Sequence, residues 1–268
     1  MALVSFSNVS KLYRPAHGQP YLAVRDFDLQ IEPAQFFCLL GPSGCGKTTV
    51  LNMLAGFEAP TEGTITVADE RVSGPGHDRA VVFQGDDSLF GWLSALENVE
   101  FGMRMRGVPA AERRERARHY LALVGLDGQE DKHPPQLSGG MKQRIQIARV
   151  LANDPTMLLM DEPFAALDAQ TRLLMQEQMR QLATVARTPV FFITHDIDEA
   201  IALGTRIGVM KAGPGSTLKG LIDVELGDVR ERADPAYLEV YRELHQMIRE
   251  EVLKGANRGR QAPQTAHA

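Results

Sequence analysis

Two glycine-bearing stretches of the sequence could hold phosphate groups. The first, GPSGCGKTT at residues 41–49, matches G-x-x-x-x-G-K-[ST] and lies between an apolar run and a helical pattern. Its glycines let backbone N–H groups turn toward phosphate oxygens, and a helix that starts there adds positive potential. Lys47 is long enough to reach the β- and γ-phosphates, and the Thr48 hydroxyl suits Mg²⁺. The predicted nucleotide-binding loop consists of Gly41, Pro42, Ser43, Gly44, Cys45, Gly46, Lys47, Thr48 and Thr49.

A pair of carboxylates follows an apolar run, MLLM, at residues 157–160. At the end of a strand, Asp161 is placed to hold the Mg²⁺ shell of a nucleotide, and Glu162 is a candidate general base for an attacking water. A general base typically contributes about 10²–10⁴ in rate. With the loop, the pair predicts nucleoside triphosphate hydrolysis.

The second glycine-bearing stretch is QLSGGMKQR at residues 136–144. Ser138 can cap the basic, helical run that follows, and Gly139 and Gly140 can expose backbone N–H groups to an anion. By itself, this pattern is more typical of an ordinary capped helix after a turn.

The elements that must position these residues predict an α/β fold. Residues 2–9, 21–32 and 63–72 are β-rich and punctuated by turns, which indicates an N-terminal antiparallel sheet. Other short runs are continuously apolar, as is typical of buried parallel strands. These runs are residues 36–40, 81–83, 157–160, 190–193 and 206–210.

Helical patterns indicate the domain organisation. We expect an ATPase domain over residues 1–222, with an inserted α-helical subdomain at about 90–150, although the same helices could instead pack flat on the sheet. A C-terminal extension at 223–255 carries an amphipathic helix that starts at Asp234-Pro235, and residues 256–268 are expected to form a disordered tail. The apolar stripe expected to pack on the core is Leu238, Tyr241, Leu244, Ile248 and Val252.

Composition limits the class of protein. The net charge of −5 argues against a general nucleic-acid binder. The apolar runs are too short to span a bilayer, and no signal peptide is indicated, so we expect a cytoplasmic chain. Cys38 and Cys45 fit neither a metal-site pattern nor a disulfide framework.

The order of the motifs along the chain indicates a protein family more specifically than any single motif does. GPSGCGKTT, LSGGMKQR, MLLMDEP and the His of ITHD follow one another as in ABC-type ATPases, which the chain resembles over residues 3–222. The resemblance implies a homodimer that forms head to tail in the ATP-bound state. Each ATP, with Mg²⁺, would lie between the phosphate loop of one subunit and the LSGG loop of the other.

The resemblance also implies roles for isolated residues. Tyr13 corresponds to the aromatic residue that stacks on adenine, and Gln84 to the glutamine that contacts Mg²⁺ or the attacking water. His195 corresponds to the switch histidine at the γ-phosphate, and Asp168 to the loop that meets the partner subunit's site.

Some stretches resemble the nitrate, sulfonate and taurine importer ATPases. They are VSGPGHDRAVVFQ at 72–84, GWLSALENV at 91–99, PFAALDAQTR at 163–172 and AGPG at 212–215. The resemblance implies integral membrane permease subunits as partners, indirect dependence on a periplasmic or extracellular solute-binding protein, no nucleic acid, and a peripheral place on the cytoplasmic face of the inner membrane. The loop GDDSLFG after Gln84 is more acidic than usual in the family, and Met141 replaces its common Gln.

Three alternatives stay open at this point. The chain could serve an importer of another small organic solute, such as a pyrimidine or a thiamine precursor. It could be a non-transport ABC ATPase, although such chains usually carry two ATPase domains or a coiled-coil insertion. A phosphate-loop kinase would need no LSGG loop.

Overall fold

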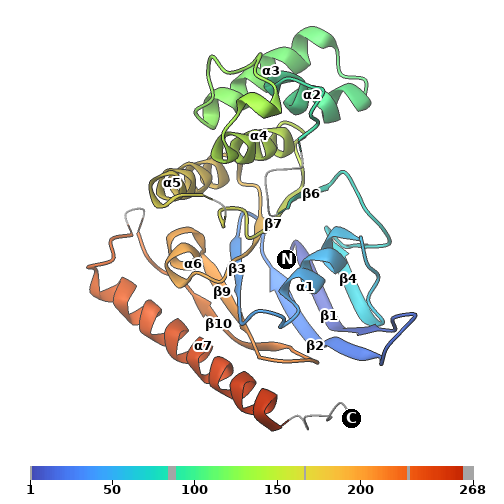
Figure 1. Ribbon diagram of the computed structural model, residues 1–268, viewed down its shortest axis with the longest axis vertical. Coiled ribbons are helices and arrows are strands. Elements are labelled where there is room, and N and C mark those ends of the chain that lie inside the picture. Colours follow the sequence, from blue (N-terminus) through green and yellow to red (C-terminus); the bar gives the residue numbers. More distant parts are fainter. Residues whose placement is uncertain (1, 84–88, 166, 228–229, 262–268) are drawn as a thin grey trace, which may run out of the picture. The chain divides into compact units, whose positions relative to one another are not determined.

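Figure 1 shows a computed structural model of the 268-residue chain. The structure describes residues 2–83, 89–165, 167–227 and 230–261. The chain forms two compact units, which are described separately. Unit 1 consists of Met1–Glu32, Phe37–Gly74 and Ile193–Ala268, and unit 2 consists of Pro33–Phe36 and Pro75–Phe192. Among the described residues, none of the helices combines the length and the apolar character needed to cross a membrane.

Unit 1 begins with an antiparallel sheet of order β2-β1-β4-β5. Its strands are β1 (Val4–Tyr13), β2 (Tyr21–Ile31), β4 (Glu62–Val67) and β5 (Glu70–Arg71). β1 is the central strand, because it pairs with both β2 and β4. Its register with β2 ends at Tyr13 opposite Tyr21, which places both tyrosines beside the loop that connects the two strands. The predicted N-terminal antiparallel sheet is confirmed.

The buried strand β3 (Phe36–Leu40) leads directly into the phosphate loop. It pairs in parallel with β9 (Arg206–Met210), and β10 (Leu218–Asp223) pairs antiparallel with β9. All five side chains of β3 are buried, as expected of a parallel strand covered on both faces. After the loop, the chain enters α1 (Lys47–Ala55). β10 was not predicted from the sequence.

The C-terminal helix of unit 1, α7 (Pro235–Gln261), packs on α6 (Ile197–Leu203) and contacts β9 (Figure 1). Its buried residues are Tyr237, Leu244 and Glu251, spaced by seven and therefore on one face. The predicted stripe is partly wrong, because Leu238 and Val252 are 37% and 51% exposed. The helix also continues six residues beyond its predicted end at Gly255.

Unit 2 combines parallel strands with most of the helices. β6 (Arg79–Val82) and β7 (Met157–Asp161) pair in parallel, and β8 (Val190–Ile193) is the other neighbour of β7. The helices are α2 (Ala95–Met105), α3 (Ala110–Leu123), η1 (Pro134–Gln136), α4 (Gly139–Leu151) and α5 (Ala169–Ala186). α2, α3 and α4 pack on one another (Figure 1). With the strands of unit 1, this confirms the predicted α/β class.

Local sequence explains where the helices of unit 2 begin. Ser94 caps α2 in a capping box: it accepts a hydrogen bond from the backbone N–H of Glu97, whose side chain accepts one from the Ser94 N–H. Pro109 precedes α3 and has no N–H to leave unsatisfied there. Ala117 and Leu121 form the buried face of α3.

Candidate functional site

The phosphate loop holds its lysine inward. Lys47 is the first residue of α1, and only 7% of its surface is exposed. Its Nζ donates hydrogen bonds to the Gly41 carbonyl oxygen at 2.8 Å and to the Pro42 carbonyl oxygen at 3.1 Å. The loop therefore fixes a positive charge at its own centre, where a phosphate oxygen could meet it.

Two glycines of the loop have steric reasons to be glycine. Gly46 has φ 95°, and a methyl group added to it would lie 3.0 Å from Val24 Cγ2 and 3.2 Å from the Ala23 carbonyl oxygen. A methyl group added to Gly41 would lie 2.8 Å from Cys45 Sγ. Gly46 is also the N-cap of α1 and has no side chain to accept from the first-turn N–H groups. The start of α1 therefore fits a phosphate group.

Tyr13 is fixed against the same helix. Its hydroxyl donates to Glu58 Oε2 at 2.5 Å and lies 3.4 Å from Oγ1 of Thr49, which is in the first turn of α1. Its ring stacks on Tyr21 with centroids 5.1 Å apart and an interplanar angle of 23°. Burial and the bond to Glu58 raise the pKa of Tyr13 to about 12, so the phenol stays neutral.

Unit 1 also brings His195 to the strand end that carries the loop. The backbone N–H of Thr194 donates to the Leu39 carbonyl oxygen at 3.3 Å, two residues before Gly41. The Thr194 hydroxyl donates to the buried carboxylate of Glu199. Asp196 caps α6 by accepting from the Glu199 N–H at 3.1 Å. The exposed His195 thus lies between two anchored residues.

The two candidate carboxylates lie in unit 2. Asp161 is the last residue of β7 and is partly exposed. Glu162 follows it with φ 46°, a left-handed conformation that is uncommon for a residue with a side chain. Such strained backbone is often found at functional sites. The carbonyl of Glu162 accepts from the Ala165 N–H at 3.2 Å, which closes a turn after the strand.

The LSGG stretch starts α4. Ser138 is its N-cap, and its Oγ accepts from the Met141 N–H at 3.3 Å. Ser138 and Gly139 are exposed, whereas Ile145 and Ala148 bury the opposite face of the helix. A methyl group added to Gly140 would lie 3.2 Å from Thr171 Cγ2 and 3.4 Å from Leu167 Cδ2. The start of α4 therefore packs beside the residues that flank Asp168.

Asp168 has a local role of its own. It caps α5 and accepts from the Thr171 hydroxyl at 2.6 Å and from the Gln170 and Thr171 N–H groups at 3.1 and 3.0 Å. The Thr171 side-chain bond, with these N–H groups, lowers the pKa of Asp168. The carboxylate is exposed and stays charged.

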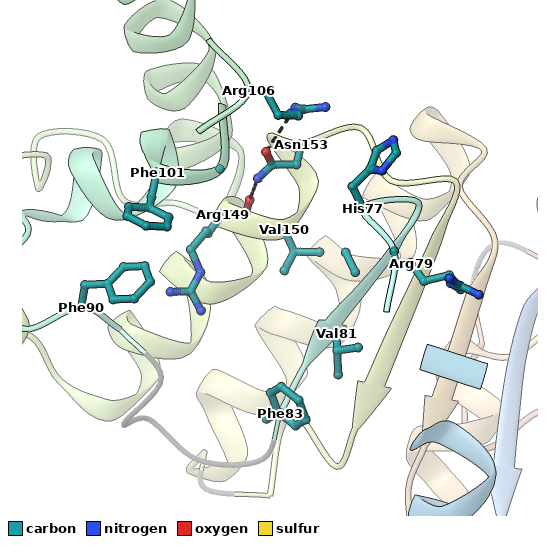
Figure 2. Close-up of a pocket in the computed structure, with 13 residues that line it drawn as sticks. His77, Arg79, Val81, Phe83, Phe90, Phe101, Arg106, Arg149, Val150 and Asn153 are labelled. Atoms are coloured by element: carbon teal, nitrogen blue, oxygen red, sulfur yellow. Dashed lines mark hydrogen bonds between the residues drawn. The ribbon is translucent and has the colours of Figure 1, made fainter. Parts of the chain in front are cut away.

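Unit 2 contains an apolar pocket with a cationic wall (Figure 2). Its volume is about 510 Å³, and its walls come from β6, α2, α4 and the segments around them. The Arg149 guanidinium lies 5.5 Å from the ring centroid of Phe90, and burial lowers the pKa of Arg149. Asn153 joins two walls, because its Nδ2 donates to the Arg149 carbonyl at 2.7 Å and its Oδ1 accepts from Arg106 at 3.2 Å. The lining residues are Gly76, His77, Arg79, Ala80, Val81, Phe83, Phe90, Phe101, Gly102, Arg106, Arg149, Val150 and Asn153.

The structure thus gathers the predicted residues in two groups. Unit 1 brings together the phosphate loop, Tyr13 and the segment of His195, and unit 2 contains Asp161, Glu162, the LSGG stretch and Asp168. Gln84 lies outside the described residues. Within the described part of the chain, no three His, Cys, Asp or Glu side chains form a metal-binding group, so the Mg²⁺ ligands Thr48, Gln84 and Asp161 stay a prediction. Sequence reasoning missed the pocket residues Phe101 and Asn153, whose spacing matches no motif.

Comparisons with known proteins agree with these motifs. The ABC transporter family model matches residues 24–165. An ABC transporter ATP-binding protein of Methanocaldococcus jannaschii is 43% identical over 92% of this chain and 91% of that protein. A taurine import ATP-binding protein of Pseudomonas putida is 49% identical over 82% of this chain and 83% of that protein. A bicarbonate transport ATP-binding protein of Synechococcus elongatus is 42% identical over 91% of this chain but only 37% of that protein.

Solved structures show the same fold. A dimeric ATP-binding cassette in a post-hydrolysis state, bound to ADP and Pi, aligns with a TM-score of 0.73 and 31% identity over 84% of this chain and 100% of that one. A component of an ABC transporter complex of Clostridium perfringens aligns with a TM-score of 0.76 over 93% of this chain and 96% of that one; at 23% identity, this likeness concerns the fold alone. The chain therefore belongs to the ABC transporter family, as an ATP-hydrolysing transport ATPase.

Proposed function

We propose that this chain drives a bacterial importer, as a subunit that dimerises around two ATP molecules and acts on a separate membrane permease. One observation carries the proposal: the buried Lys47 ammonium lies within a glycine loop at the start of a helix to which Tyr13 is hydrogen-bonded. A cationic loop beside an aromatic ring suits a triphosphate joined to a base.

In this proposal, unit 1 binds the nucleotide. Lys47 contacts the β- and γ-phosphates, and first-turn N–H groups of α1 hold the remaining oxygens. Tyr21 covers one face of the Tyr13 ring, so adenine stacks on the other face. The bond to Glu58 keeps that ring in place before ATP arrives.

Hydrolysis is proposed to depend on a carboxylate and a histidine. Glu162 accepts the proton of the attacking water, and His195 positions that water against the γ-phosphate. Thr48, Gln84 and Asp161 are the residues that would hold Mg²⁺, which when bound neutralises charge on the phosphate oxygens. The left-handed backbone at Glu162 supports this assignment, because strain at a strand end suggests a selected geometry.

The LSGG stretch is proposed to contact ATP bound to the other subunit. Ser138 and Gly139 are exposed at the start of α4, and Asp168 lies in the neighbouring loop. A dimeric solved relative with ADP and Pi supports such an assembly. Closure of the two subunits into a dimer would then depend on ATP, since these contacts exist only when the subunits meet.

The pocket of unit 2 is proposed to receive the permease. Its aromatic walls suit apolar side chains of a cytoplasmic helix, and the Arg106 and Arg149 guanidinium groups suit acidic residues beside them (Figure 2). Asp86 and Asp87, the acidic residues of the loop after Gln84, lie outside the described residues. This partnership would place the chain on the cytoplasmic face of the inner membrane.

The proposed solute is nitrate, a sulfonate, taurine or a similar small molecule, delivered to the permease by a solute-binding protein. The likeness to taurine and bicarbonate transport proteins supports this class, because both names point to small oxyacids. Reconstituting the chain with the permease encoded beside it, and measuring which of these solutes stimulates ATP hydrolysis, tests the assignment.

The ATPase assignment is tested with the purified chain. Mg-ATP hydrolysis should rise with the square of protein concentration while dimers are scarce. Lys47→Ala should lower it about 100-fold or more, whereas Lys132→Ala, which removes an exposed lysine, should not. Equal activity of the two variants would contradict the proposed role of the loop.

A further inference from the structure

α7 contributes a buried carboxylate that the proposed mechanism does not use. Only 3% of Glu251 is exposed. Its Oε2 accepts a hydrogen bond from the Ala212 backbone N–H at 2.9 Å. Its Oε1 lies 2.8 Å from Lys254 Nζ and 3.2 Å from Lys219 Nζ. A helix side chain thus binds the backbone of a turn 39 residues earlier in the chain.

Glu251 is charged in this place. Burial acts to raise its pKa, but the bonds from Lys254, the Ala212 N–H and Lys219 outweigh burial and lower the pKa to about 2. Removing one partner of a buried, charged hydrogen bond is costly, because the other is left without compensation. Loss of the hydrogen bond between Glu251 and the Ala212 N–H would therefore be costly.

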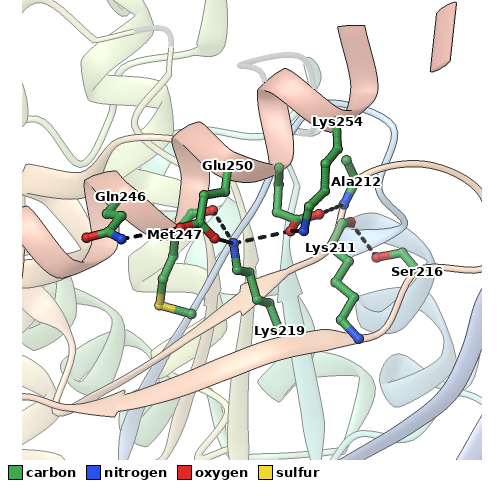
Figure 3. Close-up of polar contacts among 9 residues, drawn as sticks. Lys211, Ala212, Ser216, Lys219, Gln246, Met247, Glu250 and Lys254 are labelled. Carbon is green, nitrogen blue, oxygen red and sulfur yellow. Dashed lines mark hydrogen bonds and ion pairs between the residues drawn. The ribbon is translucent and has the colours of Figure 1, made fainter. Parts of the chain in front are cut away.

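Residues 211–217 form the turn that Glu251 holds. The Lys211 N–H donates to the Thr217 carbonyl oxygen at 2.9 Å, which closes the turn. The buried Ser216 hydroxyl donates to the Lys211 carbonyl oxygen at 2.6 Å, as Figure 3 shows. We call these seven residues the 211–217 turn.

The 211–217 turn is hydrogen-bonded to the start of β2. The Gly215 N–H donates to the Leu22 carbonyl oxygen at 2.5 Å, and the Ser216 N–H donates to the Ala23 carbonyl oxygen at 3.3 Å. In return, the Ser216 carbonyl oxygen accepts from the Arg25 N–H at 2.9 Å. Val24, between these residues, forms a parallel bridge with Ser216.

The turn is linked to the phosphate loop at two points. Val24 and the Ala23 carbonyl lie so close to Gly46 that a methyl group there would be 3.0 and 3.2 Å away. Met210, which directly precedes the turn, is equally close to Gly41: an added methyl group would lie 3.1 Å from its Cβ. Met210, which precedes the turn, and Val24, on the strand bonded to the turn, therefore border the two ends of the loop that holds Lys47.

α7 is fixed elsewhere along its length, so Glu251 projects from a held helix. The Tyr237 hydroxyl donates to Asp198 Oδ1 at 2.6 Å. Lys219 Nζ donates to the Met247 carbonyl oxygen at 2.9 Å. A methyl group added to Gly220 would lie 2.8 Å from Met247 Cε, which shows how closely β10 and α7 approach.

We propose that Glu251 is a positioning residue for the phosphate loop: it holds the 211–217 turn, and the turn keeps Val24 and Met210 against Gly46 and Gly41. This inference rests on the proposed nucleotide role of the loop. In this proposal, α7 supports the phosphate loop from behind and does not itself contact the nucleotide.

Glu251→Gln and Glu250→Gln form a matched pair for the test. Both remove one carboxylate from α7 near Lys219, but Glu250 is exposed and bonds Lys219 and Gln246 instead of the 211–217 turn. Amide hydrogen exchange of the full chain should be faster over residues 211–217 and over 41–49 in Glu251→Gln. Glu250→Gln should exchange as the wild type does.

Nucleotide binding gives a second readout that needs no hydrolysis. The Kd for ADP, measured by calorimetry, should rise about 3- to 30-fold in Glu251→Gln, the range expected for a positioning residue outside the ligand shell. In ATPase assays KM should rise by a similar factor, with kcat changed less. Glu250→Gln should leave both values within about twofold.

Faster exchange confined to 211–217, with residues 41–49 unchanged, would overturn the proposal. If Glu251→Gln does not fold, Ser216→Ala, which loosens the same turn without touching α7, decides the question by the same measurement. Failure of the nucleotide assignment gives a different result. Wild type and Lys47→Ala would then bind ADP equally, while amide hydrogen exchange over residues 41–49 would still show whether Glu251 positions the phosphate loop.

Discussion

The two glycine loops of this protein begin helices in similar ways but differ in what completes them. In the phosphate loop, the N-cap is Gly46, and Lys47 is folded inward onto the Gly41 and Pro42 carbonyl oxygens. In the LSGG loop, the Ser138 side chain caps its own helix, and Gly139 is exposed. The first loop contains its cation; the second presents a hydroxyl and backbone groups outward.

From this difference we infer that the phosphate loop binds a nucleotide by itself, whereas the LSGG loop supplies only part of a binding site. A loop with a buried lysine and an uncapped helix start has a local deficit of negative charge, which phosphate can fill. At the LSGG loop, the serine oxygen satisfies the helix start by itself. We therefore infer that the LSGG loop adds contacts to a nucleotide held elsewhere, and the predictions below test that contrast.

The largest effect is expected at neither loop but at the proposed base. Glu162→Gln should lower ATP hydrolysis by about 10²–10⁴, because water activation is lost while both loops stay intact. ATP binding, measured by equilibrium dialysis, should be retained. Hydrolysis at the wild-type rate would show that Glu162 is not the base.

The next largest effect comes from replacing a lysine in each of the two loops and comparing the losses of activity. Lys47→Ala should lower kcat/KM about 100-fold or more, the cost of losing a preorganised donor at the transition state. Lys142→Ala, near the LSGG glycines, should cost less than about tenfold, because no lysine is enclosed by that loop in our account. Steady-state assays at several ATP concentrations measure kcat/KM for both variants. Equal losses would contradict the inferred difference between the two loops.

A smaller effect comes from comparing two serine caps. Ser138→Ala and Ser94→Ala should each lower the free energy of unfolding by about 1 kcal/mol, since each removes a helix N-cap in unit 2. Only Ser138→Ala should also reduce ATP hydrolysis, by about tenfold, because it loses a hydrogen bond to charged phosphate. If both variants lose activity in proportion to stability, Ser138 is merely a cap.

Tyr13 tests the base-binding side of the phosphate loop. Tyr13→Ala should raise KM for ATP about three- to tenfold through loss of ring stacking. Tyr13→Phe keeps the ring and loses only the hydrogen bonds to Glu58 and Thr49, so its KM should stay close to that of the wild type. A Phe variant as impaired as the Ala variant would mean that the hydroxyl, not the ring, matters.

The smallest effect concerns the pH dependence of stability that Glu251 contributes through the 211–217 turn. The pKa of Glu251 is lowered from 4.5 to about 2, so its contribution to stability is present above about pH 4.5 and is lost as pH falls toward 2. The groups that face it are Lys219, Lys254 and its neighbour Glu250. Glu251→Gln should flatten this part of the acid unfolding curve relative to Glu250→Gln. Two identical curves would contradict it.

The sequence predicted the phosphate loop and the strands around it because their signals are local. FFCLL is a continuous apolar run followed at once by the glycine pattern, and the structure has β3 and α1 on either side of the loop. Ser94 and Pro109 are likewise local signals for helix starts. These features depend on neighbours within a few residues.

The missed features depend on contacts between distant residues. The core-facing side of α7 includes a carboxylate, Glu251, whose partner Ala212 is 39 residues away, so periodicity of apolar residues pointed to a neighbouring face instead. The pocket walls Phe101 and Arg149 meet only because α2 packs on α4. No spacing within either segment indicates that meeting.

The central claim is that the LSGG loop is completed only by a partner's ATP, and dimerisation of two variants tests it most directly. The molar mass of Glu162→Gln with Mg-ATP, measured by light scattering during gel filtration, should be that of a dimer. Adding Ser138→Arg should give a monomer that still binds ATP, because the phosphate loop is untouched. A normal ATP-dependent dimer of the double variant would contradict the account.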